Sequence, residues 1–325
     1  MMDKILITGA TGFIGSHLVE LCVKKGHDVI AFDRYNSNND WGWLENSDYK
    51  NDFELVLGDI RDYDSVFNTI QKCDVVFHLA ALIGIPYSYV SPLAYIRTNI
   101  EGTYNVLEAS KNLMIKEVLI TSTSEVYGTA QFVPISESHP LVGQSPYSAS
   151  KIAADQLSIS YFRSFKTPIK IIRPFNTFGP RQSSRAVIPT IISQLIANKE
   201  SLILGNLKTT RDFTFVQDTC SAMYQLYKDC KLYGIPINIG MNKEISIGDL
   251  ARKIAKLMDI NPKIIEDNKR VRPKNSEVER LLCDNSKLKK SIEWIPKYSL
   301  DDGLLMTIKD IKSNLNKYKT ENYNV

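Results

Sequence analysis

The chain has 325 residues, 43% of them hydrophobic, and a formal net charge of +4. This length allows about two domains, or one large domain with an added lobe, and the mild, scattered charge argues against nucleic-acid binding. Five widely spaced cysteines and only four histidines argue against a metal site or a disulfide framework and predict buried free thiols.

The first half of the chain alternates apolar strands with segments of helical spacing. It opens with a strand, KILITG, and no apolar run approaches the ~18–20 residues of a membrane span, so we expect a cytoplasmic protein without a signal peptide or a membrane anchor. Continuous apolar strands separated by helices predict a parallel sheet covered on both faces, a Rossmann-like, doubly wound α/β fold. The predicted strands are 4–9, 28–33, 53–59, 74–80, 117–124 and 169–176, with helices at 13–26 and 95–113.

After residue 174 the pattern changes. RPFNTFGPRQSSRAVIP is rich in proline, glycine, serine and arginine, as in a loop that lines a site, and shorter strands then mix with helices. We therefore expect an NAD-binding Rossmann domain over 1–174, with 211–240 interleaved with it. A smaller α/β substrate lobe should occupy 175–312, and a polar, mobile tail 313–325.

A glycine-rich turn, TGATGFIG, follows the first predicted strand and opens a helix. Its first glycine permits a tight turn, the second lets the backbone approach a pyrophosphate, and the third lets the helix lie close on the strand. The helix N-terminus favours phosphate groups, so the segment predicts a dinucleotide site. The residues expected to contact the cofactor here are Gly9, Thr11, Gly12, Phe13, Ile14 and Gly15.

Acidic residues end the second and third predicted strands. Asp33 would accept hydrogen bonds from the adenosine ribose and repel a 2′-phosphate, which favours NAD over NADP, although Arg34 could pair with that phosphate. Asp59 and Ile60 stand where an adenine could rest, and Asp59 fits equally well as a cap of the next helix.

Tyr147 and Lys151, in PYSASK, are four residues apart and share one face of a predicted helix. A cationic lysine beside a tyrosine would lower the pKa of the phenol. The resulting phenolate could take a proton from a sugar hydroxyl while a hydride leaves the same carbon for nicotinamide.

Together, TGATGFIG, HLAA, TSTSEVYG, YSASK and RPFNTFGPR resemble the extended short-chain dehydrogenase/reductases that act on nucleotide sugars. The resemblance extends to about residue 312. It implies a tightly held NAD, a nucleoside-diphosphate sugar in the second lobe, and a homodimer formed through a four-helix bundle of the helices near 92–113 and 145–166. It also implies cofactor contacts from Leu79, Ala80 and Ala81 of HLAA.

Within that family, Thr123, Ser124 and Glu125 resemble the triad of the 4,6-dehydratases. There, the threonine would bond the C4 oxygen and the glutamate would remove the C5 proton as the C6 hydroxyl leaves. Ser124 replaces the aspartic acid of some dehydratases, so the acid for water loss is not identified. Nucleotide-sugar uronate decarboxylases carry the same triad, and a solvated glutamate or a simple 4-epimerase are further alternatives.

Other stretches resemble the dehydratases of bacterial legionaminic acid synthesis, namely DRYNSNNDWGWLEN, AALIGIPYSYVSPLAYIRTN and RPFNTFGPRQSSRAVIPTII. They imply a GDP- or UDP-linked N-acetylglucosamine substrate. The segment after HLAA has no lysine or arginine until Arg97, which mildly disfavours a uronate. The residues implied to contact the substrate are Asn176, Arg181, Arg185, Val187, Arg211 and Arg272. Each arginine could instead form a surface salt bridge. Glu277 could bind a ribose or pair with an arginine.

Overall fold

The structure is a computed structural model that describes residues 2–229, 232–267, 270 and 273–318. Its centre is a seven-stranded sheet of order β10-β6-β5-β4-β1-β2-β3, in which every pairing is parallel. The expected Rossmann-like, doubly wound sheet is confirmed. Its strands are β1 (Lys4–Thr8), β2 (Asp28–Arg34), β3 (Glu54–Gly58), β4 (Val75–His78), β5 (Glu117–Thr121), β6 (Ile169–Pro174) and β10 (Pro236–Ile239).

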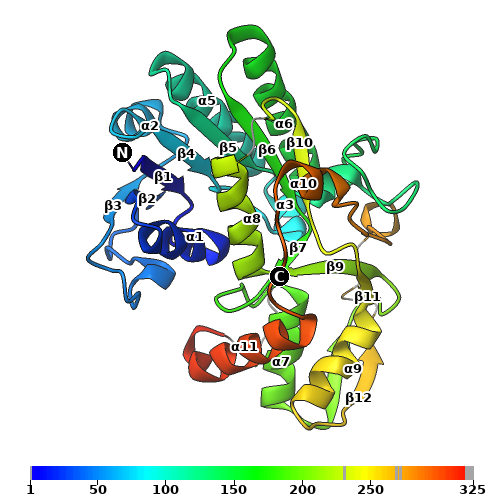
Figure 1. Cartoon of the computed structure of the whole chain (residues 1–325). Coiled ribbons are helices and arrows are strands. Elements are labelled where there is room, and N and C mark those ends of the chain that lie inside the picture. Colours follow the sequence, from blue (N-terminus) through cyan, green and yellow to red (C-terminus); the bar gives the residue numbers. More distant parts are fainter. Residues whose placement is uncertain (1, 230–231, 268–269, 271–272, 319–325) are drawn as a thin grey trace.

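Helices cover both faces of this sheet (Figure 1). One face packs on α1 (Phe13–Lys24) and α8 (Val216–Asp229). The other packs on α2 (Tyr63–Ile70), α5 (Gly102–Asn112) and α6 (Pro146–Phe165). Apolar side chains on both sides of the strands are buried by these helices, which explains why the strands are continuous apolar runs.

The second lobe lies below the large sheet in Figure 1 and contains α7, α9 and α11. It has a three-stranded sheet of order β11-β9-β7 and a parallel pair, β12-β8. β10 returns to the large sheet, so the chain crosses between the lobes more than once. The lobe's elements are β7 (Asn176–Phe178), α7 (Val187–Ala197), β8 (Ser201–Leu204), β9 (Thr210–Phe215), β11 (Glu244–Ser246), α9 (Ile247–Leu257), β12 (Lys263–Glu266) and α11 (Leu300–Ser313). α10 (Ser286–Ser291) instead packs against β10 of the large sheet.

Short elements complete the described chain. α3 (Ile85–Val90) and α4 (Pro92–Tyr95) follow β4, and 3₁₀ turns occupy η1 (Gly42–Leu44), η3 (Ser124–Tyr127), η5 (Lys274–Ser276) and η6 (Leu315–Lys317). The single helix expected over 95–113 is instead the end of α4, a π-helical segment η2 (Ile96–Glu101), and α5. Within the described residues, no helix has both the length and the apolar character to span a membrane.

The predicted tail is shorter than expected. Residues 313–318 are part of the folded structure, because Tyr318 is buried and its ring packs near Trp43 of the segment between β2 and β3. The remainder of that tail, 319–325, lies outside the described residues. Cys22, Cys220 and Cys283 are buried free thiols, whereas the free thiol Cys73 is only partly buried. Cys230 lies outside the described residues.

Candidate active site

The glycine-rich turn after β1 is shaped by close backbone approach. Gly9 has a φ of +69°, and a Cβ there would lie 2.9 Å from the Cα of Ala80. A Cβ at Gly15 would lie 2.1 Å from the carbonyl oxygen of Gly9. Only glycine fits both positions, and the turn leads into α1 from Gly12, its N-cap residue. This is the cradle that a pyrophosphate at a helix N-terminus requires.

The segment after β4 forms the neighbouring wall of this turn. The backbone amides of Leu79 and Ala80 each lie 3.2 Å from the Thr8 hydroxyl, to which they donate. Ala81 follows them, partly exposed. The turn and the HLAA segment are therefore joined at the carboxyl ends of adjacent strands. Phe13 and Ile14 make the first turn of α1, where both are partly exposed.

Asp33, at the end of β2, holds the same turn. Its Oδ2 accepts hydrogen bonds from the amide and the hydroxyl of Thr11, both at 2.7 Å, and its Oδ1 accepts from the Arg34 amide at 2.7 Å. Oδ1 accepts only one of these bonds and keeps a second lone pair, so contact with a ribose is compatible with them. The Arg34 side chain is exposed.

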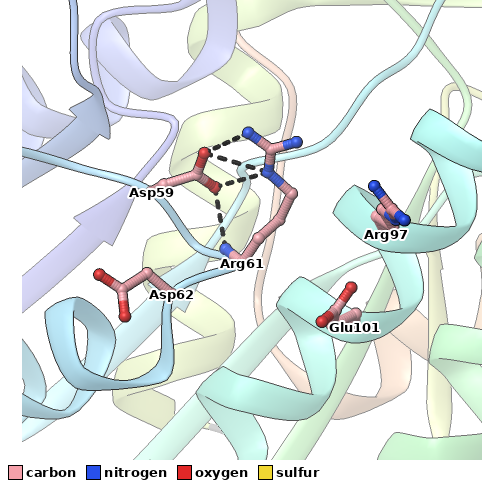
Figure 2. A pocket seen from close by; sticks show the side chains of 5 residues that line it. All are labelled: Asp59, Arg61, Asp62, Arg97 and Glu101. Carbon is pink, nitrogen blue, oxygen red and sulfur yellow. Dashed lines mark hydrogen bonds and ion pairs between the residues drawn. The ribbon is translucent and has the colours of Figure 1, made fainter.

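A charged cavity of about 400 Å³ lies beside the end of β3, and Figure 2 shows the side chains that line it. Asp59 accepts from the amide and the Nε of Arg61, both at 2.9 Å, and this pairing lowers the pKa of Asp59. The cap of α2 is Asp62 rather than Asp59. Arg97 and Glu101 reach the cavity from η2, and spacing along the sequence offered no signal for them.

Ile60, the second residue expected near an adenine, is buried, and its side chain fills the space beside Gly102. The structure therefore gives Ile60 a packing role next to the cavity. An adenine contact by Asp59 and Ile60 stays a prediction.

The TSTSEVYG segment is not strand throughout. β5 ends at Thr121, and Thr123 then caps the η3 turn by accepting a hydrogen bond from the Glu125 amide at 3.2 Å. The turn carries Glu125 at the carboxyl end of the sheet, where it is partly exposed, and buries Ser124. The glutamate is therefore held on a capped turn next to the strand end.

Tyr147 and Lys151 come to the same place on α6. The helix begins with a capping box between Ser145 and Ser148 and with a proline at its first position. Tyr147 forms a hydrogen bond with Thr123, and Lys151 donates to the carbonyl oxygen of Thr121 at 2.8 Å. The structure thus brings together the predicted threonine, glutamate, tyrosine and lysine.

The electrostatics of this group correct one expectation. Burial raises the pKa of Tyr147, the negative charge of Glu125 raises it further, and the bond with Thr123 opposes both. Burial lowers the pKa of Lys151 to about 8, with Asp155 opposing. The predicted lowering of the tyrosine pKa is therefore wrong for this arrangement, because burial dominates and the ammonium is bonded to the strand carbonyl.

An apolar floor lies against Tyr147, as the sequence suggested. The ring centroids of Tyr95 and Tyr147 are 6.2 Å apart, and Ile85 and Leu82 complete the cluster. A cation is nevertheless nearby, because Arg185 is close enough to lower the pKa of Tyr95 while burial raises it. The lack of lysine and arginine in the segment after HLAA therefore does not mean that the folded site lacks a nearby cation.

The remaining residues expected at the substrate have different surroundings. Asn176 opens β7, and its buried Oδ1 has no hydrogen-bond partner among the described residues. Arg211 is buried and lies 3.5 Å from Glu277. Val187 opens α7, partly exposed. Arg272 lies outside the described residues.

Arg181 differs from its expectation. Its guanidinium donates to Glu20 of α1 at 2.9 Å, and its backbone amide donates to Asp310 of α11 at 3.0 Å. These contacts tie the loop to two helices, which is the salt-bridge alternative considered for this arginine. The structure gives Arg181 a structural role.

Comparison with known families decides the larger grouping. The family model described as GDP-mannose 4,6 dehydratase matches residues 6–307. The chain belongs to this family. The extended short-chain dehydrogenase/reductase resemblance is thereby confirmed.

Relatives within the GDP-mannose 4,6 dehydratase family catalyse different reactions. A dTDP-D-glucose 4,6-dehydratase of Dictyostelium discoideum is 36% identical over 78% of this chain, and the match spans 62% of that protein's length. A UDP-N-acetyl-alpha-D-glucosaminuronate decarboxylase of Bacillus cytotoxicus is 34% identical over 95% of this chain and 97% of its own.

A solved family structure agrees with the fold. The dTDP-glucose 4,6-dehydratase of Streptomyces venezuelae, solved with NAD and TYD bound, is 25% identical, with a TM-score of 0.88 over 97% of this chain and 99% of that one. Family membership therefore establishes the scaffold, and the choice of reaction depends on the site.

Proposed function

We propose that this chain is an NAD-dependent nucleotide-sugar 4,6-dehydratase, a lyase that recycles its cofactor. The observation that supports the proposal is the η3 turn, where Thr123 accepts a hydrogen bond from the Glu125 amide at 3.2 Å, so that the partly exposed carboxylate lies beside the strand end that bonds Lys151. A simple 4-epimerase removes and returns hydride at one carbon and needs no second carboxylate base. A dehydratase needs a base for C5, and Glu125 is available for that step.

The cofactor proposed is NAD. The glycine turn is shaped for a pyrophosphate by Gly9 and Gly15, and Asp33 provides a carboxylate where a 2′-phosphate would be repelled. Family relatives solved with NAD bound support this choice. NAD would accept a hydride from C4 of the sugar and later supply it to C6.

The chain's own residues would move the protons. Thr123 would bond the C4 oxygen, and Tyr147 would take the proton of the C4 hydroxyl. Burial and Glu125 oppose ionisation of the tyrosine. The ammonium of Lys151, which in this arrangement bonds the carbonyl oxygen of Thr121, would have to act on the tyrosine hydroxyl to favour the phenolate. The C4 ketone acidifies the C5 proton, which Glu125 would remove as the C6 hydroxyl leaves as water.

The substrate proposed is GDP- or UDP-linked N-acetylglucosamine, with GDP preferred, as in the legionaminic acid branch that the sequence resembles. Asn176 has an unpartnered oxygen for a polar ligand, and Arg185 lies near the catalytic tyrosine cluster. Guanidinium groups suit a diphosphate because they bind it through two parallel hydrogen bonds.

Decarboxylation of a nucleotide-sugar uronate is the second candidate. It is favoured by Arg185, a cation near Tyr95 that could pair with a uronate carboxylate, and by the decarboxylase relative that matches nearly the full length of the chain. Both reactions begin with the same C4 oxidation, so the same four residues would serve the first step.

Mass spectrometry of the products distinguishes the candidates. Purified protein is incubated in turn with GDP- and UDP-N-acetylglucosamine and with the matching uronate. We expect the mass of one water to be lost from an N-acetylglucosamine nucleotide. Loss of carbon dioxide from the uronate alone would establish the decarboxylase, and an unchanged mass with altered stereochemistry would establish an epimerase.

The assembly proposed is a homodimer built from η2, α5 and α6. Large apolar side chains on these elements and on α4 are exposed, at 55% for Leu93, 50% for Ile96, 44% for Tyr104 and 53% for Phe165. Because α5 and α6 pack together, two copies could pair these helices as a four-helix bundle that covers the apolar side chains.

Light scattering tests this assembly. Ile96→Glu is expected to convert a dimer into a monomer, because it places a charge in the buried interface. Met114→Glu is the matched control, since Met114 is 87% exposed beyond the end of α5. A monomeric wild type, or a dimer that survives Ile96→Glu, would contradict the proposed interface.

A further inference from the structure

A third chemical group follows Tyr147 and Lys151 along α6. Asp155 is four residues beyond Lys151, so the three side chains share one helix face. Asp155 is fully buried at 0% exposure and is the one charge that opposes the lowering of the Lys151 pKa by burial. The helix therefore carries a base, a cation and a buried carboxylate in one row.

Asp155 is fixed by an arginine from the sheet. Arg173, near the end of β6, donates from Nε to the Oδ2 of Asp155 at 2.9 Å, and its Nη2 lies 2.8 Å from the same oxygen in an ion pair. Burial raises the pKa of Asp155, and Arg173, Ser122 and Lys151 oppose that rise. The ion pair and its charge-assisted bond from Nε hold one oxygen of the carboxylate against the guanidinium.

The same arginine reaches the turn that carries Glu125. Its Nη1 donates to the hydroxyl of Tyr127 at 2.9 Å, and Tyr127 donates to Asn238 at 2.7 Å. Tyr127 is the last residue of η3. The buried network thus joins β6 to α6 and to the η3 turn, the two segments that supply the proposed catalytic groups.

A buried ion pair is costly in stability and needs a reason. An apolar pair of similar volume would serve packing as well or better. The other charged or titratable groups that face Lys151 do not replace Asp155. His78 of β4 is buried between Thr8 and Thr103, and burial lowers its pKa to about 3, so it stays neutral at ordinary pH.

Tyr147 precedes Lys151 on α6, Glu125 lies across from it on the η3 turn, and Arg173 approaches from β6 as the partner of Asp155. Neither Tyr147 nor Glu125 contributes to the Lys151 pKa, whose two causes are burial and Asp155. Among these groups, Asp155 is therefore the carboxylate that favours the charged form of Lys151.

We propose that Asp155 is a positioning residue, a buried counter-ion held by Arg173 that keeps the ammonium of Lys151 charged at the end of β5 and couples it to the turn of Glu125. This role rests on the proposed function, in which the charged lysine favours the tyrosine phenolate. Removing the carboxylate leaves burial unopposed, so Lys151 loses its proton at a lower pH. Activity that needs the ammonium then disappears at a lower pH as well.

The first test is Asp155→Asn. We expect the alkaline limb of the pH profile of turnover to move toward acid by about one pH unit, the lower end of the effect of a nearby opposite charge, because Asp155 is shared with Arg173. The titration of Lys151 is followed separately by ¹³C NMR of protein labelled at the lysine ε-carbons, with the signal assigned by Lys151→Arg. It should move in the same direction.

Two further variants separate this role from stability. Asp155→Leu with Arg173→Met removes both buried charges together, so the variant should fold while Lys151 still lacks its counter-ion. Glu117→Gln is the matched control, because Glu117 of β5 forms another buried ion pair with Lys170, which lies on β6 as Arg173 does. It should lower stability and leave both the alkaline limb and the Lys151 titration in place.

Folded variants whose Lys151 titrates as in the wild type would overturn the proposal, as would an equal shift in Glu117→Gln. The NMR readout does not depend on the substrate. If no nucleotide sugar is dehydrated by the wild type but the Lys151 titration still moves, the proposed function fails and the counter-ion role of Asp155 stands.

Discussion

Replacing Tyr147 with phenylalanine is expected to lower turnover by roughly 10²–10⁴-fold, the usual contribution of a general acid–base group. The ring would still pack against Tyr95, so the loss comes from the hydroxyl that bonds Thr123. Without it, no group in this arrangement can take the C4 hydroxyl proton as the hydride leaves. Single-turnover absorbance of the reduced nicotinamide measures this first step directly.

Tyr95→Phe is the matched control for Tyr147→Phe. It removes a hydroxyl from the adjoining buried ring, where the group donates to the carbonyl oxygen of Gly84 at 2.5 Å. We expect a small loss of stability and near-normal nicotinamide reduction. Reduction at the wild-type rate in Tyr147→Phe would show that the tyrosine is not the base.

The large sheet was predictable because its signals are local. Apolar runs without alternation indicate strands buried on both faces, and the glycine spacing after β1 reflects contacts within one strand–turn–helix unit. Gly15, for example, approaches Gly9, only six positions earlier along the printed sequence. Tyr147 and Lys151 were likewise placed on one face by helical spacing alone.

Features that depend on long-range contacts were not predictable. The partner of Arg181 is Glu20 on α1, and the strand-end carbonyl of Thr121 holds Lys151. A long, flexible side chain bonds whichever group folding brings near, and sequence spacing carries no information on that choice. The direction of the Tyr147 pKa was misjudged for the same reason, because it depends on burial.

The buried network shows the same limit. Asp155 lies in the helix that the YSASK motif predicted. Its proposed role as a counter-ion, however, depends on Arg173 in β6 and on Tyr127 in the η3 turn. Each of these residues is unremarkable along the sequence. Only the fold shows that one guanidinium joins the helix of the lysine to the turn of the glutamate.

Glu125→Gln is expected to separate the oxidation step from the loss of water. The amide keeps the size of the carboxylate but cannot accept the C5 proton, so dehydration should fall by roughly 10²–10⁴-fold. Oxidation at C4 should persist. The charge of Glu125 raises the pKa of Tyr147, so its removal lowers that pKa and makes the phenolate easier to form. The expected result is reduced nicotinamide that accumulates.

Deuterium exchange locates the blocked step. In deuterated water, the wild type should exchange the C5 proton of the substrate, and Glu125→Gln should not. Ser124→Ala is the control, since Ser124 is buried beside the glutamate on the same turn. It should retain C5 exchange, and any slowing of water loss would identify Ser124 as part of the acid path. Full dehydration by Glu125→Gln would exclude the glutamate as the base.

The same variant also discriminates between dehydration and decarboxylation. Once a 4-ketone has formed on a uronate, the electron pair of the C5–C6 bond can flow toward the C4 oxygen as carbon dioxide leaves, so no C5 proton has to be removed. Dehydration has no such route, because the C5–H bond must break for the C6 hydroxyl to leave. A large loss of activity in Glu125→Gln therefore identifies the carboxylate on η3 as a dehydratase base. A small loss with a uronate substrate would show that Glu125 is not the C5 base, and would favour Arg185 as the residue that binds the uronate carboxylate.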